Sequence, residues 1–192
     1  MRDIIIRAVS EEDAPRLLEI YAPYVRDTAI TFELDVPSPG EFSSRVSRTL
    51  EKYPYLAAER GGRIIGYAYA GAFHPRAAYA WCAEVSIYVD VSERRTGAGR
   101  ALYEALERCL AAMGIKNLYA CIAYPESDDE HLDKNSVNFH SHFGYELCGR
   151  FHRCGFKFSR WYDMVWMEKM LSPHSMAEPV KTFGEIRKEL SL

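Results

Sequence analysis

Apolar residues recur along the chain with two different periods. Continuous or alternating apolar runs of strand length predict β-strands, and apolar residues spaced three and four positions apart predict helices. Strands are expected at residues 4–9, 55–60, 63–70, 81–89, 117–123, 145–156 and 161–170. Helices are expected at residues 10–21, 39–53, 102–113 and 135–143. The order β-α-α-β-β-β-α-β-α-β-β, without internal repeats, indicates a mixed α+β protein.

Short polar and glycine signals mark where several of these elements begin and end. Ser10 and Asp13 form a capping-box pattern at the first helix. The pair Gly61-Gly62 predicts a tight hairpin turn, and Gly144 is expected to end the fourth helix. Residues 28–32 are expected to connect the first two helices with some strand character.

Composition limits the class of protein. The 192 residues suffice for one domain with a sizeable core. The 24 basic and 27 acidic side chains nearly balance, and no basic stripe points to nucleic-acid binding. The apolar run at residues 4–6 is too short for a signal peptide or a membrane span, so we expect a cytoplasmic protein. Residues 128–130 (Asp-Asp-Glu) predict a solvated acidic loop.

The cysteines and histidines give little sign of a disulfide or a metal site. No cysteine belongs to a Cys-x-x-Cys pair, and all five are expected to be reduced and mostly buried: Cys82, Cys109, Cys121, Cys148 and Cys154. One His/Cys group has a spacing that matches no standard zinc pattern, so no metal is expected: His140, His142, Cys148, His152 and Cys154.

Residues 172–192 form a polar tail after the last predicted strand. Phe183, Ile186 and Leu190 would share one face of a short helix. Such a helix could dock on residues 1–171 or on a second subunit, but a frayed terminus is the default expectation.

The strand at 81–89 is followed by a basic turn with two glycines, residues 94–100 (Arg-Arg-Thr-Gly-Ala-Gly-Arg), and then by a helix. In this arrangement backbone N–H groups and a helix N-terminus point at one spot, which suits a phosphate. No P-loop sequence is present, and a dinucleotide fingerprint would need a third glycine where Leu102 stands. A purely structural glycine turn is the alternative.

Polar side chains alternate along the strand that leads into this turn. Glu84, Ser86 and Tyr88 share one face, because successive side chains of a strand point to opposite sides. A carboxylate just before a phosphate-binding turn suits a general base, which acts directly or through a water. The alternative is a surface glutamate in an ion pair.

Three segments together resemble one family. The turn reads as Gln/Arg-x-x-Gly-x-Gly/Ala, and it is accompanied by residues 79–89 and by Gly155-Phe156-Lys157-x-x-x-Trp161-x-Asp163. They resemble the GNAT superfamily of N-acetyltransferases, in its phosphinothricin and methionine sulfoximine acetyltransferase branch, over residues 4–170. The resemblance implies one GNAT domain at residues 1–171, with a mixed, mostly antiparallel twisted sheet of about seven strands flanked by helices.

The resemblance also implies a reaction. Acetyl-CoA would be the cosubstrate, the amine of a small amino-acid-like molecule the acceptor, and the protein a homodimer. Transfer would be direct, with Glu84 as the base. Three alternatives stay open: a covalent route through Cys82, a protein or peptide N-acetyltransferase, and a CoA-binding regulatory module without catalysis.

The same resemblance assigns binding residues. The cosubstrate would be held by backbone groups of the strand and by the turn: Ile87, Tyr88, Val89, Arg94, Arg95, Thr96, Gly97, Ala98, Gly99 and Arg100. The acceptor would be contacted by the preceding loop and by the strand: His74, Pro75, Arg76, Glu84, Val85 and Ser86. Arg76 could pair with a carboxylate or phosphinate of the acceptor, or it could be a solvated side chain.

The segment at 133–140 departs from the family pattern. Alignment on Ser136 places Asp133 where the family has an asparagine, and Asn135 is expected to contact the pantetheine instead. His140 takes the position of a tyrosine that protonates the departing thiolate, so it is the second catalytic candidate. The alternative for His140 is a helix histidine packed beside the sheet.

The motif at 155–163 lies in the hairpin expected from the last two strands, 145–156 and 161–170. A structural interpretation pairs Lys157 with Asp163 across the hairpin, with Trp161 as a packing plate. In the family this hairpin approaches the substrate pocket and the subunit interface.

Overall fold

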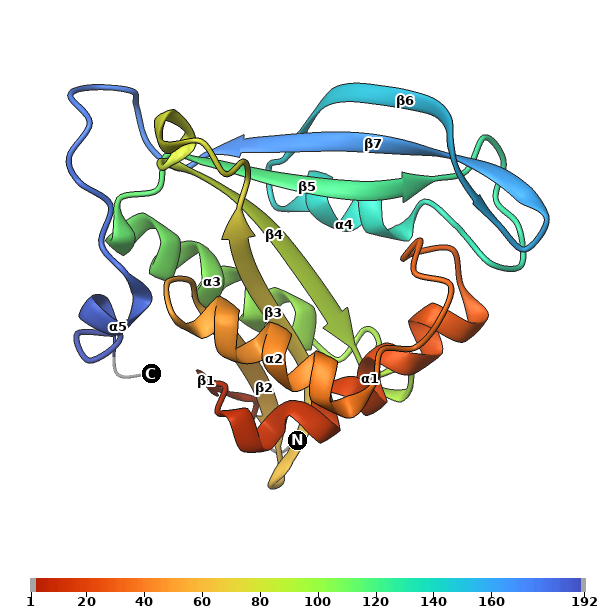
Figure 1. Ribbon diagram of the computed structural model, residues 1–192, viewed down its shortest axis with the longest axis horizontal. Coiled ribbons are helices and arrows are strands. Elements are labelled where there is room, and N and C mark those ends of the chain that lie inside the picture. Colours follow the sequence, from red (N-terminus) through yellow and green to blue (C-terminus); the bar gives the residue numbers. More distant parts are fainter. Residues whose placement is uncertain (1–2, 191–192) are drawn as a thin grey trace.

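A twisted seven-stranded sheet forms the centre of the computed structural model, which describes residues 3–190 (Figure 1). Its strands are β1 (Ile5–Ala8), β2 (Tyr55–Arg60), β3 (Arg63–Ala72), β4 (Cys82–Val89), β5 (Asn117–Tyr124), β6 (Glu146–Lys157) and β7 (Arg160–Met170). They lie in the order β1-β2-β3-β4-β5-β7-β6, and only the β4–β5 pair is parallel. The predicted mixed, mostly antiparallel sheet is confirmed.

The helices begin and end near the predicted signals. They are α1 (Ala14–Asp27), α2 (Pro39–Leu50), α3 (Ala98–Met113), α4 (Asn135–His142) and α5 (Phe183–Ile186). Short 3₁₀ turns lie at Glu11–Asp13, Ala77–Tyr79 and Val91–Glu93. At the first of them the Ser10 N–H donates to the Asp13 carboxylate at 2.8 Å, which confirms the capping box. Gly144 follows α4 with a φ of +80°.

Two cores cover the two faces of the sheet. On one face the apolar stripe of α3, including Leu102, Leu106 and Leu110, packs on β2 to β5. On the other face α1 and α2 pack on β2 and β3, with Leu17 and Val46 fully buried. Side chains of β2, β3 and β4 therefore alternate between the two cores, as a strand buried on both faces requires.

The connection at residues 28–32 is a loop and not a strand. Its backbone pairs with a distant loop, because the Ala29 N–H donates to the His131 carbonyl at 3.0 Å. The Thr28 hydroxyl donates to the Tyr24 carbonyl at 2.7 Å. The β-branched residues that predicted strand character therefore serve local turns and packing.

The acidic loop is also less solvated than expected. Asp129 accepts the N–H groups of His131 and Leu132 at 2.8 and 2.9 Å and the Tyr162 hydroxyl at 3.1 Å. Its carboxylate therefore organises the loop, while Asp128 and Glu130 are exposed.

The expectation of mostly buried cysteines is wrong. Only Cys109 is buried, whereas Cys121, Cys148 and Cys154 are exposed and Cys82 is half-buried. Cys148 and Cys154 lie on the edge strand β6, where a side chain has few neighbours.

The tail packs on the body of the molecule. Phe183 and Ile186 are buried beside α3. The Lys181 N–H donates to the Met113 carbonyl at 2.9 Å, and the Phe183 N–H to the Lys52 carbonyl at 2.8 Å. The default expectation of a frayed terminus is therefore wrong for this segment.

Neither a membrane-spanning helix nor a cluster of metal-ligating side chains is found among residues 3–190. No helix in that range is long and apolar enough to cross a membrane. No group of three or more His, Cys, Asp or Glu side chains within it is placed to hold a metal ion.

Candidate active site

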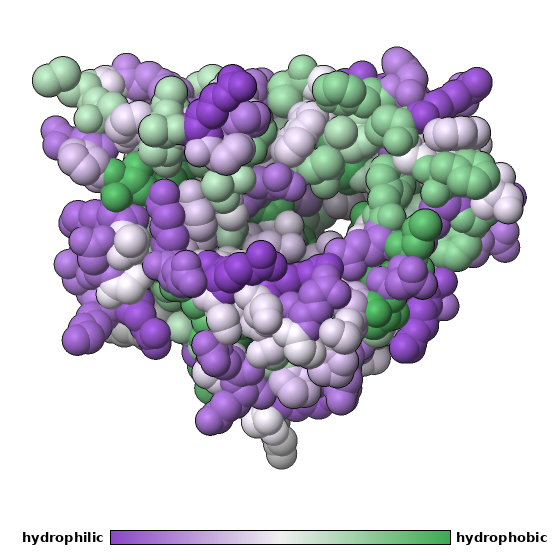
Figure 2. Space-filling model, viewed as in Figure 1, coloured by the Kyte–Doolittle hydropathy of each residue, from purple (hydrophilic) through white to green (hydrophobic). Residues whose placement is uncertain are grey.

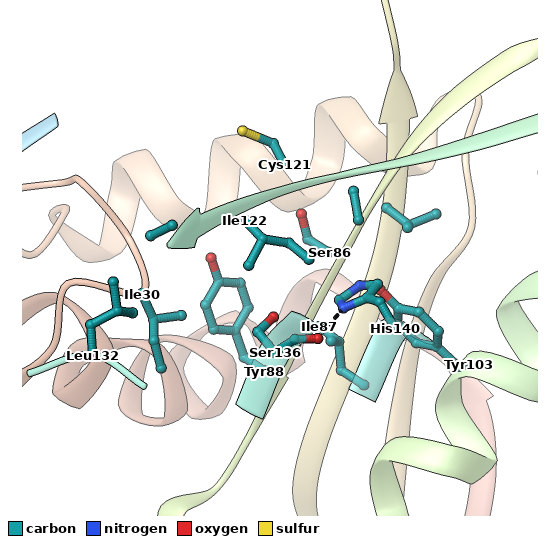
Figure 3. A pocket seen from close by; sticks show the side chains of 13 residues that line it. Ile30, Ser86, Ile87, Tyr88, Tyr103, Cys121, Ile122, Leu132, Ser136 and His140 are labelled. Carbon is teal, nitrogen blue, oxygen red and sulfur yellow. Dashed lines mark hydrogen bonds between the residues drawn. The ribbon is translucent and has the colours of Figure 1, made fainter. Parts of the chain in front are cut away.

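The strands β4 and β5 begin side by side and then diverge (Figure 1). Their parallel pairing joins only Cys82–Glu84 to Asn117–Tyr119. Beyond it, Val85–Tyr88 and Ala120–Ala123 line a pocket between the strands. Figure 3 shows this pocket with α4 at one end, and Figure 2 shows a hollow near the centre of the same view.

Backbone groups of β4 face this pocket. The Asp90 N–H donates to the Ile65 carbonyl of β3 at 2.8 Å, so the neighbouring Val89 belongs to a non-hydrogen-bonded pair of the antiparallel ladder. Because successive N–H groups of a strand point in opposite directions, the N–H groups of Ile87 and Val89 point toward β5, and the N–H of Tyr88 points toward β3. Of the three predicted backbone contributors, Ile87 and Val89 thus offer amides to a ligand, and Tyr88 does not.

Glu84 lies where the two strands separate. Burial raises the pKa of its carboxyl above the ordinary value, and no neighbouring charge or hydrogen bond offsets this effect. Glu84 forms no ion pair with any residue in the range 3–190, and its strand is central and not at an edge. The alternative of a surface ion pair is therefore wrong, and the carboxylate is available as a base.

The turn between β4 and α3 is braced by nearby residues and by arginines from distant parts of the chain, among them Arg60, which pairs with Glu93 at 2.6 Å. The Asp90 carboxylate accepts the Ser92 N–H at 3.0 Å and pairs with Arg16 at 2.5 Å. The Thr96 hydroxyl donates to the Glu93 carbonyl at 2.7 Å. These contacts hold the start of α3 against the end of β4.

The two glycines of the turn have different roles. Gly97 has a φ of +92° at the start of α3, which a residue with a Cβ rarely adopts. The backbone of Gly99 does not have a positive φ, but a Cβ there would lie 3.2 Å from the Phe139 ring of α4. Gly99 therefore allows α4 to pack closely against the start of α3.

The surroundings of the turn suit an anion. No side chain caps α3, so the first-turn N–H groups of Ala98, Gly99 and Arg100 have no partner within the helix. Arg94, Arg95 and Arg100 are exposed. The helix dipole, the open amides and these guanidinium groups all favour a pyrophosphate.

His140 lies at the α4 end of the pocket beside Tyr103 (Figure 3). Burial lowers the pKa of its imidazole to about 4, so the ring is neutral at pH 7. Nδ1 lies 2.7 Å from the Ser136 carbonyl, which can only accept, so Nδ1 carries the proton. Nε2 then accepts the Tyr103 hydroxyl at 2.7 Å. With both nitrogens engaged, this geometry favours the packed histidine over a proton donor.

The two candidates for pantetheine contact bond to each other. The Asn135 amide donates to the Asp133 carboxylate, and Asn135 is exposed at the start of α4. Neither residue lines the pocket between β4 and β5, whereas Ser136 does.

The predicted acceptor loop begins beside Glu84. Gly71 is the register partner of Glu84 on β3, and the exposed His74, Pro75 and Arg76 follow shortly after it. The rings of Phe73 and Tyr119 stack with their centroids 4.1 Å apart. This contact holds the start of the loop against β5, at the last residue pair before β4 and β5 separate.

The predicted strand residues Val85 and Ser86 face opposite sides of the sheet. Val85 points into the α3 core, so only its backbone is available to an acceptor. Ser86 lies on the face of Glu84 and lines the pocket.

The expected Lys157–Asp163 pair does not form. Lys157 is buried and donates to the carbonyls of Val25 and Thr31 at 2.8 and 2.9 Å. Asp163 pairs with Arg150 at 2.6 Å and also accepts a backbone N–H from β6. Lys157 thus ties the hairpin to the loop after α1, because the unpaired carbonyls of that loop need donors.

The other two positions of the motif also differ from expectation. Trp161 packs on Phe156, its register partner across the hairpin, with ring centroids 5.0 Å apart, but it is 62% exposed and does not belong to the core. A Cβ on Gly155 would overlap the Phe32 ring, so this glycine is required by the same loop.

Sequence reasoning missed two groups of residues. Tyr103 is fully buried and holds His140, but its helical position reads as an ordinary core residue. A tyrosine cluster lies under α2, and its signal is the alternation Tyr67-Ala-Tyr69 on one face of β3.

Named relatives match nearly the whole chain. A phosphinothricin N-acetyltransferase of Streptomyces viridochromogenes is 29% identical over 185 residues, which cover 96% of this chain and 97% of the relative. An L-methionine sulfoximine/L-methionine sulfone acetyltransferase of Pseudomonas aeruginosa is 31% identical, with 88% and 95% covered. The crystal structure of a phosphinothricin acetyltransferase of Sinorhizobium meliloti, in complex with acetyl-CoA, has a TM-score of 0.82 at 31% identity, with 94% and 98% covered.

The profile of the acetyltransferase (GNAT) domain matches residues 6–166. The predicted enzyme class is thereby confirmed, and so is acetyl-CoA as the cosubstrate that GNAT enzymes use. The geometry agrees, with open amides on a diverging strand and at the following helix N-terminus. The chain belongs to the GNAT family of acetyltransferases.

Proposed function

We propose that this enzyme transfers the acetyl group of acetyl-CoA to the α-amine of a small amino-acid-like molecule. The observation that carries the proposal is Glu84, a half-buried carboxylate without an ionic partner among residues 3–190, at the point where β4 and β5 separate. Support for the acceptor class comes from relatives named for phosphinothricin and for methionine sulfoximine or sulfone.

The chain offers a fitting site for acetyl-CoA. The first-turn amides of α3 and the exposed Arg94, Arg95 and Arg100 would hold the pyrophosphate. The N–H groups of Ile87 and Val89 would bind the pantetheine and the thioester carbonyl. Acetyl-CoA would supply an activated acetyl group when bound, and Glu84 precedes Ile87 on the same strand.

Direct transfer then needs one base and a polarised carbonyl. Glu84 accepts a proton from the acceptor amine, directly or through a water, so that the nitrogen lone pair is free. The nitrogen forms a bond to the acetyl carbon, and the bond from that carbon to sulfur breaks. The proton that the nitrogen then loses passes through solvent to the thiolate, so that coenzyme A leaves as the thiol. Donors on β4 stabilise the charge that develops on the carbonyl oxygen.

His140 has a supporting place in this proposal. Its neutral ring and its two hydrogen bonds shape the end of the pocket. Because its Nδ1 proton is held by the Ser136 carbonyl, His140 is not the proton donor to the departing thiolate. The exposed loop with His74, Pro75 and Arg76 would meet the acceptor, and Arg76 provides a guanidinium for its carboxylate.

We further propose that the protein is a homodimer and is located in the cytoplasm. The end of the sheet formed by β5, β7 and β6 exposes large apolar side chains, including Leu147, Phe151 and Trp161. A second copy would cover this surface. Light scattering of the purified chain should give twice the mass of one chain, and a monomer at micromolar concentration would contradict the dimer.

Release of free thiol from acetyl-CoA tests the activity. The acceptors should include phosphinothricin, methionine sulfoximine, methionine sulfone, ordinary amino acids, polyamines and a lysine peptide. We expect turnover with the amino-acid-like acceptors. Turnover with the peptide alone would favour a protein N-acetyltransferase, and no turnover with any amine would favour a CoA-binding module.

A further inference from the structure

The pocket between β4 and β5 receives side chains from both faces of the sheet. On the face that carries Glu84, its polar lining consists of Ser86, Tyr88 and Cys121. On the face that α3 and α4 cover, its polar lining consists of Tyr103, Ser136 and His140. Two reactants can therefore meet in this gap from opposite sides of the sheet.

The proposed cosubstrate would arrive on the α3 side. Its pyrophosphate would lie at the start of α3, and its pantetheine would follow the open amides of Val89 and Ile87. The Glu84 side chain points to the other face, because the neighbouring Val85 points into the α3 core. The amine would thus enter on the Glu84 side. The sulfur, which stays attached to the pantetheine, would leave on the α3 side.

Ser136 has the free hydrogen-bond donor on that side. The Tyr103 hydroxyl donates to Nε2 of His140 at 2.7 Å, and Nδ1 of His140 donates to the Ser136 carbonyl at 2.7 Å. The Ser136 hydroxyl forms no hydrogen bond with any residue in the range 3–190, and the residue is half-buried. Ser136 and His140 are four residues apart, so they share the face of α4 that turns to the pocket (Figure 3). Of the three polar side chains on this side, Ser136 is the one available to a ligand.

A hydroxyl in this place suits a departing thiolate. Negative charge develops on the sulfur as its bond to the acetyl carbon breaks, and a donor that is already in place stabilises such charge. Hydrogen bonds to a charged group are stronger than those between neutral groups. A serine hydroxyl is much less acidic than a thiol, so it would keep its proton and contribute the hydrogen bond alone.

We propose that the Ser136 hydroxyl donates a hydrogen bond to the sulfur of coenzyme A as the thiolate leaves. Ser136 is then a catalytic residue that stabilises the leaving group, while the proton that converts the thiolate to the thiol comes through solvent. The inference rests on the proposed function, because it concerns the leaving group of the same transfer.

The binding of coenzyme A in the absence of an acceptor gives the first test. Desulfo-coenzyme A, which lacks the sulfur, is the matched ligand. Isothermal titration calorimetry at pH 9, where more of the thiol is ionised than at pH 7, measures both. Ser136→Ala should raise the Kd for coenzyme A about fivefold or more and the Kd for desulfo-coenzyme A less than about twofold. Ser141→Ala, at an exposed serine of the same helix, is the control and should change neither value.

Steady-state kinetics give an independent readout. Ser136→Ala should lower kcat about tenfold, because the hydrogen bond strengthens only as charge develops on the sulfur. The KM for acetyl-CoA should stay within about twofold, since the sulfur of the intact thioester is uncharged. Ser141→Ala should leave both values unchanged.

The assignment of Ser136 and the proposed function can fail separately. An equal loss of affinity for coenzyme A and desulfo-coenzyme A would show that the hydroxyl serves the pantetheine or the fold. Unchanged affinity for both ligands, or an unchanged kcat, would show that it does not stabilise the thiolate. Each of these results would overturn the assignment while acetylation persists. A wild-type enzyme that binds coenzyme A but acetylates no amino-acid-like amine would overturn the proposed function itself.

Discussion

The turn at residues 94–97 and the loop at residues 28–33 are held by different parts of the chain. The turn combines short-range contacts such as Asp90–Ser92 and Glu93–Thr96 with ion pairs from Arg16 to Asp90 and from Arg60 to Glu93. The loop depends on Lys157, whose bonds to Val25 and Thr31 span 132 and 126 residues. The backbone conformation of the proposed cosubstrate turn is thus set locally by Gly97, whereas the loop, whose Ile30 lines the pocket between β4 and β5, is held by the closing hairpin.

The largest expected effect concerns Glu84, the proposed base on β4. Glu84→Gln should lower kcat by about 10²–10⁴-fold, because the amide cannot accept the proton. The KM for acetyl-CoA should stay within about twofold. Steady-state kinetics of the variant, with Glu104→Gln on exposed α3 surface as control, measures both. Unchanged kcat would remove Glu84 from the mechanism and favour a non-catalytic module.

The pH profile offers a second test of Glu84. Only the carboxylate form acts as a base, so kcat/KM should fall as the pH decreases through the pKa of Glu84. Burial raises that pKa, so the acid limb should lie above the ordinary value of a glutamate. The residual activity of Glu84→Gln should lack this limb. An identical limb in the variant would assign it to another group.

Lys157→Met should affect the acceptor side selectively. The substitution leaves the carbonyls of Val25 and Thr31 without their donor, at about 1–3 kcal/mol of unfolding free energy. We expect the KM for the acceptor to rise about tenfold and the KM for acetyl-CoA to stay within twofold. Lys52→Met, at an exposed lysine, is the control. An equal rise in both KM values would show that the two regions are not independent.

Gly97→Ala should have a smaller effect, on the cosubstrate side. The φ of +92° disfavours alanine by about 1 kcal/mol, and the start of α3 should shift to relieve it. The KM for acetyl-CoA should rise severalfold, with little change for the acceptor. Gly40→Ala on α2 is a matched control, because a Cβ there meets no atom within 4 Å. If Gly97→Ala changed only the KM for the acceptor, the turn at residues 94–97 would serve the acceptor and not acetyl-CoA.

The smallest effect is expected at Cys82. Its thiol is half-buried, and burial raises its pKa, which disfavours the nucleophilic thiolate. Cys82→Ala should keep kcat/KM within about twofold in the same assay. Complete loss of turnover would replace direct transfer by a covalent route.

Some elements were predictable because their signals are local. The α3 stripe, the Gly61-Gly62 hairpin and the Ser10–Asp13 cap depend on residues a few positions apart, and all three are present. The loop at 28–32 was misassigned because its β-branched residues satisfy packing and not a sheet. The predicted Lys157–Asp163 pair does not form, because Lys157 donates instead to the carbonyls of Val25 and Thr31. These carbonyls are far away in sequence, so proximity within the hairpin could not reveal them.

The sequence by itself determined the order of elements, the glycine turn and Glu84 on one face of its strand, because each depends on local periodicity or backbone conformation. Only the tertiary structure decided that β4 and β5 separate after three residue pairs, and that His140 is neutral beside Tyr103. It also decided that Lys157 reaches the carbonyls of Val25 and Thr31. These features arise from contacts and desolvation between distant segments, which no local pattern encodes.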